Sequence, residues 1–402
     1  MPAPASALIV AGEASGDRHG AALAAALPRH LPVALRVPQG DPELAERVTW
    51  FGIGGNLMAA AGVEVITPAS AFNVLGIVEV LGHLPRIYGI YRGLLREIDR
   101  RRPRFAVLID FPDFNLRLAR QLHRRGIPVI YFVAPQAWAW RPGRVKLLRR
   151  YVRKLICIFP FEEEFFRRAG VDVEYVGHPL LEVAKPTLSR EEFFQRYKLR
   201  PDRPTVCLLP GSRNQEVARH LPRLLEAAAR LARQRPLQFT LVRASFVHPL
   251  VLEGILRHHR DLPLTVIEDT PYNALAWADA AVISSGTATV EALLVGTPMV
   301  VVYRVATPSW WVGKLLVRTP HYSMVNLLAG ERLVPELIQS DFTPARVATE
   351  VERLLSDPAE RARIQKELGR VKERLGPPGA SERAARAVAA AVAAAEHAPQ
   401  RQ

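Results

Sequence analysis

Short apolar runs alternate with longer stretches of helical periodicity along most of the chain. The apolar runs are rich in Val, Ile and Leu. They lie at 7–11, 105–109, 129–133 and 155–159 in the first half, and at 205–209, 238–242, 264–267, 280–283 and 299–303 in the second. Buried parallel strands separated by helices give this alternation. The pattern therefore predicts an α/β protein built on parallel sheets.

The alternation lapses in a proline-bearing, charged stretch at residues 177–204. A chain of 402 residues exceeds what one compact core usually holds, so we expect two main domains. The predicted division is an N-terminal Rossmann-like domain over 1–180, a linker over 181–204, a C-terminal Rossmann-like domain over 205–365, and a C-terminal helix and tail over 366–402. Doubly wound sheets bind ligands beyond the carboxyl ends of their strands. Function is therefore expected in strand-to-helix loops that face a central cleft.

Composition narrows the class of protein. Hydrophobic residues make up 49% and charged residues 23% of the chain, as in ordinary globular domains. The longest apolar runs fall short of the ~18 residues of a membrane-spanning helix, and the N-terminus lacks the basic segment of a signal peptide. Cys157 and Cys207 each lie within an apolar run, which indicates core packing in a reducing cytoplasm rather than a zinc site.

The formal net charge of +15 favours anionic partners, such as a phosphorylated substrate or an anionic membrane surface. Basic residues cluster at 100–104 and 146–154, but neither cluster belongs to a nucleic-acid-binding motif. We therefore do not expect nucleic acid as a partner.

Candidate functional residues follow the apolar runs of the first half. The loop at 12–20 brings amides and Ser15 to the end of the first predicted strand, although close packing of helix and sheet also explains its glycines. The glycine-rich stretch 51–55 is interpreted as a loop along which a substrate lies. Asp110 ends an apolar strand, so its carboxylate is expected at the cleft, where partial desolvation would raise its pKa toward that of a general base.

Two further pairs of candidate residues follow Asp110 along the sequence. Asp113 and Asn115 precede a helical run, and helix capping explains at least one of them. Gln136 and Trp138 follow the next predicted strand. An aromatic ring beside polar side chains suits contact with a sugar or an acyl chain, and core packing is the alternative.

Candidate phosphate- and nucleotide-binding residues lie in the second half. Arg213 follows a glycine turn at the end of a strand, where a fixed positive charge suits a phosphate. At 283–287 a strand passes directly into a helix through small hydroxyl residues. Free amides at that helix start suit a diphosphate, although plain N-caps give the same pattern. Glu291 follows one turn later and is placed to accept both ribose hydroxyls of a nucleotide. Because the chain has no Asp-x-Asp sequence, we expect the leaving group to be neutralised without a metal ion.

Motifs in the same order along the chain resemble those of the lipid-A-disaccharide synthase family. They are the stretches at 11–17, 76–82, 109–115, 138–141, 177–179, 209–213, 285–287 and 326–330. The resemblance implies a GT-B fold, in which two Rossmann-like domains carry doubly wound parallel sheets. It also implies an inverting transfer without a cofactor. UDP-2,3-diacylglucosamine and 2,3-diacylglucosamine 1-phosphate (lipid X) would give a β(1→6) lipid A disaccharide 1-phosphate and UDP.

The resemblance also implies roles for single residues. Asp110 matches the catalytic base that deprotonates the 6-hydroxyl of the acceptor. The residues expected to bind UDP are Arg213, Ser285, Gly286, Thr287, Glu291 and Asn326. The residues expected to contact the acceptor or a sugar are Ser15, Gly16, Asn115, Gln136 and Trp138.

Residues 74–88 are more apolar than one helix face needs, and core packing is the plain explanation. Our hypothesis is that part of this stretch forms a patch that docks on the anionic cytoplasmic leaflet. The residues of the patch are Val78, Leu81, Leu84 and Ile87. The protein is then expected to be cytoplasmic and peripherally associated with the inner face of the inner membrane, and an oligomer is allowed.

Other functions fit the same loops. One is a GT-B transferase that uses UDP-N-acetylglucosamine, of the peptidoglycan-precursor type, with His19 as its base. Another is a non-hydrolysing UDP-N-acetylglucosamine 2-epimerase. A non-catalytic nucleotide-binding module is the third alternative, and it gives Asp110 no reason to face the cleft.

Overall fold

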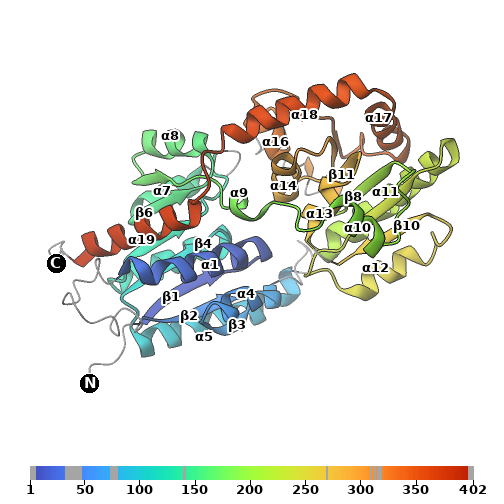
Figure 1. Ribbon diagram of the computed structural model, residues 1–402. Helices are drawn as coiled ribbons and strands as arrows, with labels where there is room; N and C mark the ends of the chain where they lie inside the picture. Colours follow the sequence, from blue (N-terminus) through green and yellow to red (C-terminus); the bar gives the residue numbers. More distant parts are fainter. Residues whose placement is uncertain are drawn as a thin grey trace. The chain divides into compact units, whose positions relative to one another are not determined.

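The computed structural model describes residues 6–31, 48–72, 80–138, 142–268, 270–307, 310–311, 314 and 319–396, without side chains at 80–84. The chain forms two units. The N-terminal unit holds residues 1–179 and 377–402, and the C-terminal unit holds residues 180–376. Figure 1 labels their elements, and each unit is described by itself.

The N-terminal unit contains a seven-stranded parallel sheet with the order β3-β2-β1-β4-β5-β6-β7. The strands are β1 (Ser6–Ala11), β2 (Thr49–Gly54), β3 (Val63–Pro68), β4 (Phe105–Ile109), β5 (Val129–Phe132), β6 (Lys154–Cys157) and β7 (Val173–Tyr175). The helices are α1 (Ala14–Ala26), α4 (Asn56–Ala60), α5 (Val80–Arg101), α6 (Pro112–Arg124), α7 (Gly143–Tyr151), α8 (Pro160–Arg168) and α19 (Ala380–Glu396), with short 3₁₀ helices at Leu27–Arg29 and Ala69–Phe72.

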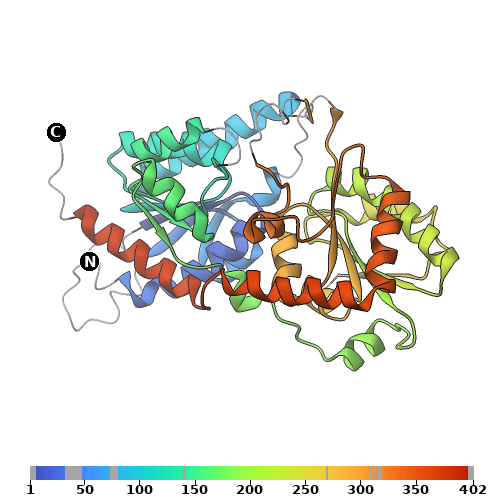
Figure 2. The same cartoon turned by 90° about the horizontal axis from the view of Figure 1, so that it is seen from above.

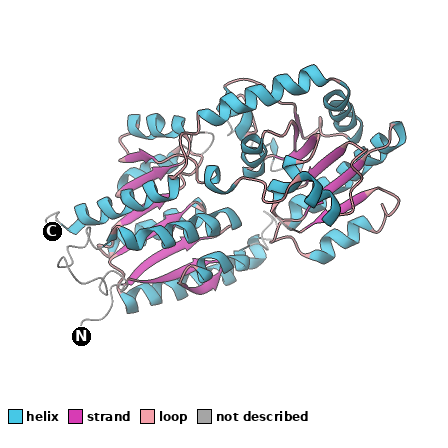
Figure 3. Cartoon of the chain, viewed as in Figure 1, coloured by secondary structure: helices cyan, strands magenta, loops and turns pink. Residues whose placement is uncertain are grey.

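Helices cover both faces of this sheet (Figure 3). Successive side chains of a strand point to opposite faces, so a strand that is apolar at every position needs cover on both. Leu8 and Val10 of β1 share one core with Leu94 of α5. On the opposite face, α1 approaches so closely that a Cβ on Gly16 would lie 3.2 Å from the Cβ of Ala11. Gly16 therefore serves close packing of α1 on β1, and its predicted contact with a sugar stays a prediction.

Within the segment predicted as a C-terminal helix and tail, the Ala-rich residues Ala380–Glu396 form α19, which packs within the N-terminal unit beside α1 (Figure 2). Arg153 donates to the carbonyl oxygens of Ala391 (Nε, 3.2 Å) and Ala394 (Nη2, 2.5 Å), and Arg104 pairs with Glu396. Cations at a helix C-terminus offset the partial negative charge of its last carbonyls. The sequence-based division set this segment apart, whereas its contacts place it with the first sheet.

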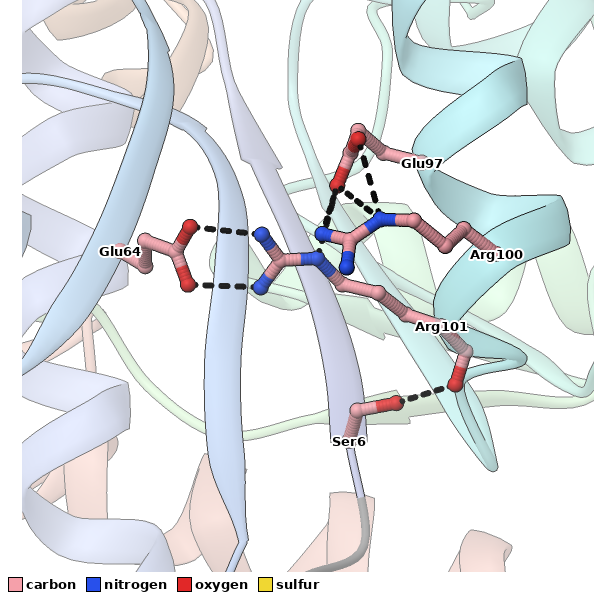
Figure 4. Close-up of polar contacts among 5 residues, drawn as sticks. All are labelled: Ser6, Glu64, Glu97, Arg100 and Arg101. Carbon is pink, nitrogen blue, oxygen red and sulfur yellow. Dashed lines mark hydrogen bonds and ion pairs between the residues drawn. The ribbon is translucent and has the colours of Figure 1, made fainter.

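The basic run at 100–104 is neutralised largely within the unit (Figure 4). Arg101 binds both carboxylate oxygens of Glu64 at 2.6 Å, and its Nε lies 2.9 Å from Glu97. Arg100 also binds Glu97, and these bonds hold the pKa of Glu97 down at about 2. The Arg101 carbonyl accepts a hydrogen bond from Ser6 Oγ at 2.9 Å. The Arg101 guanidinium therefore ties α5 to β3, and the Arg101 carbonyl ties α5 to β1.

The C-terminal unit contains a six-stranded parallel sheet with the order β10-β9-β8-β11-β12-β13. The strands are β8 (Thr205–Leu209), β9 (Gln238–Val242), β10 (Leu264–Ile267), β11 (Ala280–Ser284), β12 (Met299–Tyr303) and β13 (Glu336–Ile338). The helices with continuous described bounds are α9 (Leu180–Val183), α10 (Arg190–Arg196), α11 (Asn214–Gln234), α12 (Pro249–Leu256), α13 (Pro271–Ala276), α14 (Thr287–Val295), α16 (Met324–Ala329), α17 (Pro344–Ser356) and α18 (Pro358–Glu373).

The predicted α/β class with two parallel sheets is confirmed, and every predicted strand is present within two residues at either end. The interpretation of 51–55 as a substrate loop is wrong, because Thr49–Gly54 is strand β2 in the interior of the sheet. Its glycines permit close contacts: a Cβ on Gly52 would lie 1.8 Å from the carbonyl oxygen of Ile9, and a Cβ on Gly55 would lie 2.4 Å from Asp17.

The stretch predicted as a linker folds against the C-terminal unit. The buried side chain of Asn273 accepts hydrogen bonds from the amides of Thr187 (2.8 Å) and Leu188 (3.0 Å). Trp277 Nε1 donates to the Leu188 carbonyl at 3.1 Å. Ser189 caps α10 by accepting from the amide of Glu192. These bonds give the stretch a fixed path over α13.

The structure describes only part of the proposed membrane patch. Val78 is outside the described residues, and the side chains of Leu81 and Leu84 are outside them too. Ile87, on α5, is partly buried against the core of the N-terminal unit. Among the helices that the structure describes, none combines the length and apolarity needed to cross a membrane.

Candidate active site

Each sheet reverses its strand order beside its first strand. The reversal lies between β1 and β4 in the N-terminal unit and between β8 and β11 in the C-terminal unit. In open α/β sheets, ligands bind at this position, outside the carboxyl ends of the strands. Asp110 directly follows β4, and Ser285 directly follows β11. Both candidate centres therefore lie where their sheets are expected to bind ligands.

The backbone at Asp110 adopts an unusual conformation. Asp110 and Phe111 have φ values of 46° and 49°, so two successive non-glycine residues are left-handed between β4 and α6. Val133, at the end of the adjacent β5, has a φ of 65°. Such residues cost about 1–3 kcal/mol each and persist where the surroundings impose them. Three of the six described non-glycine residues with a positive φ therefore lie just after two adjacent strands.

Hydrogen bonds from three directions hold the Asp110 turn. The amide of Asp110 donates to the carbonyl oxygen of Phe132 at 3.0 Å. Its carbonyl oxygen accepts from Asn115 Nδ2 at 2.8 Å and from the Tyr131 hydroxyl at 2.5 Å. Asn115 Nδ2 also lies 3.2 Å from the carbonyl oxygen of Ile109. Asn115 is fully buried, so its observed role is to hold the turn, and its contact with an acceptor stays a prediction.

Charged groups surround the Tyr131 hydroxyl. Burial and the negative charge of Asp110 raise the pKa of Tyr131 well above its usual value, while the positive charge of Arg144 opposes them. Arg144 is buried on α7, and its Nη2 lies 2.8 Å from Oδ1 of the exposed Asp113. The carbonyl of Asp110 is therefore bonded by a phenol that stays protonated, close to a buried cation.

Trp138 is positioned by a buried acid. Its Nε1 donates to Glu162 Oε1 at 3.1 Å, and its ring meets Phe161 edge-on at 4.9 Å. Glu162 also accepts from the amide of Phe159 at 3.3 Å. Burial raises the pKa of Glu162 to about 8, against these hydrogen bonds and with a contribution from the charge of Asp110. Gln136, in the same loop, is exposed.

The segment 12–20, which was predicted as a loop, is mostly helix, because α1 begins at Ala14. Ser15 is half-buried in the first turn of α1, and a Cβ on Gly12 would lie 2.4 Å from the Phe111 ring. Burial lowers the pKa of His19 to about 4, with help from Arg18. His178 is also buried, and its pKa falls to about 3. Both imidazoles are uncharged at neutral pH, and a group as weakly basic as His19 is poorly matched to deprotonating a hydroxyl.

The candidate donor site begins after β8. Gly211 has a φ of 137°, and a Cβ there would lie 2.5 Å from the Cβ of Glu216, so this position requires glycine. Glu216 accepts from the amide of Ser212 at 2.9 Å and lies 3.5 Å from the guanidinium of Arg213. The Arg213 side chain is 48% exposed, so it can reach a ligand.

The turn after β11 has the form expected for an anion site. Gly286 has a φ of 157° and no atom within 4 Å of its missing Cβ, so main chain lies open there. Thr287 begins α14, whose first amides lack intrahelical acceptors. Ser285 Oγ donates to the carbonyl oxygen of Tyr322 at 2.7 Å. Glu291, 8% exposed, lies 3.4 Å from the Tyr272 hydroxyl.

Asn326 acts within the protein. Its Nδ2 donates to Val334 O and to Glu336 Oε1, each at 2.9 Å, and its Oδ1 accepts from the amide of Val334 at 3.0 Å. Glu336 Oε1 also accepts from the amide and hydroxyl of Ser323, at 2.8 and 2.6 Å. This network fixes the loop whose Tyr322 carbonyl receives Ser285. A direct contact of Asn326 with UDP stays a prediction.

The sequence matches the lipid-A-disaccharide synthetase family over residues 7–391. The chain belongs to that family. A lipid-A-disaccharide synthase of Solibacter usitatus is 47% identical over 382 residues, which cover 95% of this chain and 96% of the relative. Members of the lipid-A-disaccharide synthetase family are glycosyltransferases, so the predicted family and enzyme class are confirmed, and the match favours the main function over its alternatives.

Solved structures place the fold of this family member among GT-B proteins. The calicheamicin glycosyltransferase CalG4 superposes with a TM-score of 0.54 at 19% identity, over 99% of this chain and 100% of CalG4. A UDP-GlcNAc 2-epimerase from Neisseria meningitidis gives 0.60 at 11% identity, over 94% and 97%. Because a transferase and an epimerase fit about equally well, this likeness shows the fold alone, and the family match separates the functions.

Several residues around these two centres escaped sequence reasoning. Glu162, Glu336 and Tyr131 act on partners far away in the sequence or through backbone atoms, and nothing in their local pattern marks them. Glu162 stands at the third position of α8 and accepts from the amide of Phe159, but Phe159 has no side-chain acceptor, so the sequence shows no capping-box signature there.

Proposed function

We propose that this member of the lipid-A-disaccharide synthetase family joins UDP-2,3-diacylglucosamine to 2,3-diacylglucosamine 1-phosphate, with Asp110 as the base. The observation that carries the proposal is the position of Asp110. It follows β4 beside the strand-order reversal, in a strained turn held by Asn115 and Tyr131. A carboxylate held at such a place is suited to accept a proton.

The proposed chemistry is a single displacement. The 6-oxygen of the acceptor attacks the anomeric carbon, the bond from that carbon to the UDP oxygen breaks, and the hydroxyl proton passes to Asp110. The charge that develops on UDP is taken up by Arg213 and by the amides at the start of α14. Glu291 is proposed to accept from the ribose hydroxyls.

The test is the transferase assay with both purified lipids in the presence of EDTA. Wild type should form disaccharide, since Arg213 and the helix start, rather than a metal ion, are proposed to neutralise the leaving group. Asp110→Asn should lose about 10²–10⁴-fold in kcat, the usual contribution of a general base, with UDP affinity kept. Asp172→Asn, an exposed carboxylate of the same unit, is the matched control and should keep full activity. Full activity in Asp110→Asn would remove Asp110 as the base.

We also propose that the protein works at the cytoplasmic face of the inner membrane through Val78, Leu81, Leu84 and Ile87. Ile87 packs partly against the core, so its replacement should also lower stability. The sharper variant therefore replaces the other three residues by Ser. It should keep activity on detergent-dispersed lipids and lose co-sedimentation with anionic vesicles. Unchanged co-sedimentation would remove the patch from the proposal.

A further inference from the structure

His220, on α11, bridges two loops of the C-terminal unit. It is fully buried, and its Nδ1 lies 2.8 Å from the carbonyl oxygen of Pro210. Its Nε2 lies 3.0 Å from both the amide nitrogen and the carbonyl oxygen of Arg304. Burial lowers the pKa of His220, so the ring is neutral near pH 7. A neutral ring with its proton on Nδ1 donates to Pro210 and accepts from the amide of Arg304.

The two loops that His220 bridges lie on either side of the candidate anion site. Pro210 directly follows β8 and Arg304 directly follows β12. Strand β11 lies between β8 and β12, and the turn at Ser285 and Gly286 follows β11. The imidazole thus links the chain on both flanks of this turn.

Packing fixes the ring itself. The aromatic rings of Tyr303 and Phe342 each lie 5.7 Å from the imidazole, centre to centre. The same loop contains Gly211, whose backbone conformation is open only to glycine, and then the half-exposed Arg213. Without a bond at Pro210, this glycine-containing segment has more freedom to lose when a ligand binds.

We propose that His220 is a positioning residue for nucleoside diphosphate binding, acting by clamping the loops after β8 and β12 around the turn at Ser285 and Gly286. This inference rests on the proposed function, because it takes Arg213 and that turn as the diphosphate site. His220 itself does not touch the ligand. It holds the Arg213 segment in the binding conformation, so the ordering cost is met during folding rather than on binding.

The test compares UDP affinity by calorimetry in wild type, His220→Phe and His220→Asn. Phe keeps an aromatic ring between Tyr303 and Phe342 but makes neither hydrogen bond, so the Kd for UDP should rise about tenfold. Asn keeps a donor near the position of Nδ1 and should recover part of that loss. Acceptor affinity should not change in either variant.

Leu224→Ala is the matched control for stability. Leu224 is buried one turn further along α11, so its truncation should lower the melting temperature and leave the Kd for UDP unchanged. If His220→Phe behaves in the same way, with lower stability and unchanged Kd, His220 is a core residue only and the clamp is overturned. If wild type itself fails to bind UDP, the proposed function fails and the clamp fails with it.

Discussion

The turn at Asp110 lends itself to a double-mutant cycle, because two side chains donate to one carbonyl oxygen. Asn115→Ala removes the donor at 2.8 Å from Asp110 O and 3.2 Å from Ile109 O, and Tyr131→Phe removes the donor at 2.5 Å. At about 1 kcal/mol for each net hydrogen bond, the single variants should cost about 2 and about 1 kcal/mol of unfolding free energy. The double variant leaves the carbonyl without either donor, which adds about 1–2 kcal/mol beyond the sum.

The same four proteins should also show non-additive losses in kcat. Left-handed backbone costs about 1–2 kcal/mol per residue, and Asp110 and Phe111 both adopt it. Loss of both donors removes bonds that offset this cost, so the turn should relax and the carboxylate should shift. We expect the double variant to lose at least about tenfold in kcat, which corresponds to about 1.4 kcal/mol. Urea unfolding and turnover at saturating substrate, measured on all four proteins, give both cycles. Strictly additive unfolding energies with unchanged kcat would refute the idea that these bonds hold the base in place.

Three further predictions follow from other parts of the structure. Glu162 has its pKa raised to about 8 from 4.5, so the folded state retains a proton that the unfolded state loses. Its contribution to stability should therefore be complete below about pH 4.5 and lost as pH rises to about 8; melting temperatures across this range should fall in wild type, and Glu162→Gln should lack this component of the slope. Gly286→Ala should weaken UDP binding about tenfold, because the Cβ meets no neighbour but the backbone must leave its φ of 157° at a cost of about 1–3 kcal/mol; equal calorimetric Kd values would contradict this. Arg153→Met should speed hydrogen exchange in the last turn of α19, whereas Arg150→Met, at an exposed position, should not.

Most of the strands that sequence reasoning found are buried along most of their length, and β10, with three partly buried residues, is the exception. Thr205–Leu209 and Met299–Tyr303 match their predicted limits because both faces of these parallel strands are covered, so no polar residue interrupts them. Strand β2 was missed because its glycines looked like a loop. Gly52 is required there because its φ is 155° and because the carbonyl of Ile9 comes within 1.8 Å of where its Cβ would be, a contact that local sequence does not contain.

In the candidate centres too, the features that local sequence contains could be predicted, and those that depend on distant contacts could not. The positions of Asp110, Arg213 and the turn at Ser285 were predictable because each lies in the segment that follows an apolar strand, and chain order alone then puts them at a carboxyl edge. Asn115 and Asn326 are predicted to contact ligands, a prediction that stays open, while the bonds that the structure shows for these two buried side chains go to backbone atoms and to Glu336. An amide that supports a loop and an amide that touches a ligand have the same letter in a sequence. Only their partners distinguish them.

The two units hold their candidate ligand-binding turns by opposite means, and the chemistry explains the difference. An anion can be bound by main-chain amides, so the C-terminal unit places glycines at Gly211 and Gly286, where a positive φ costs little. The proposed base is a side chain, so glycine cannot take the place of Asp110, and hydrogen bonds from Asn115 and Tyr131 hold the left-handed backbone there. Removing the bonds that hold these turns should therefore change different kinetic properties in the two units. Removing supports around Asp110 should lower kcat first, whereas removing supports around Gly286 should raise the Kd for UDP first.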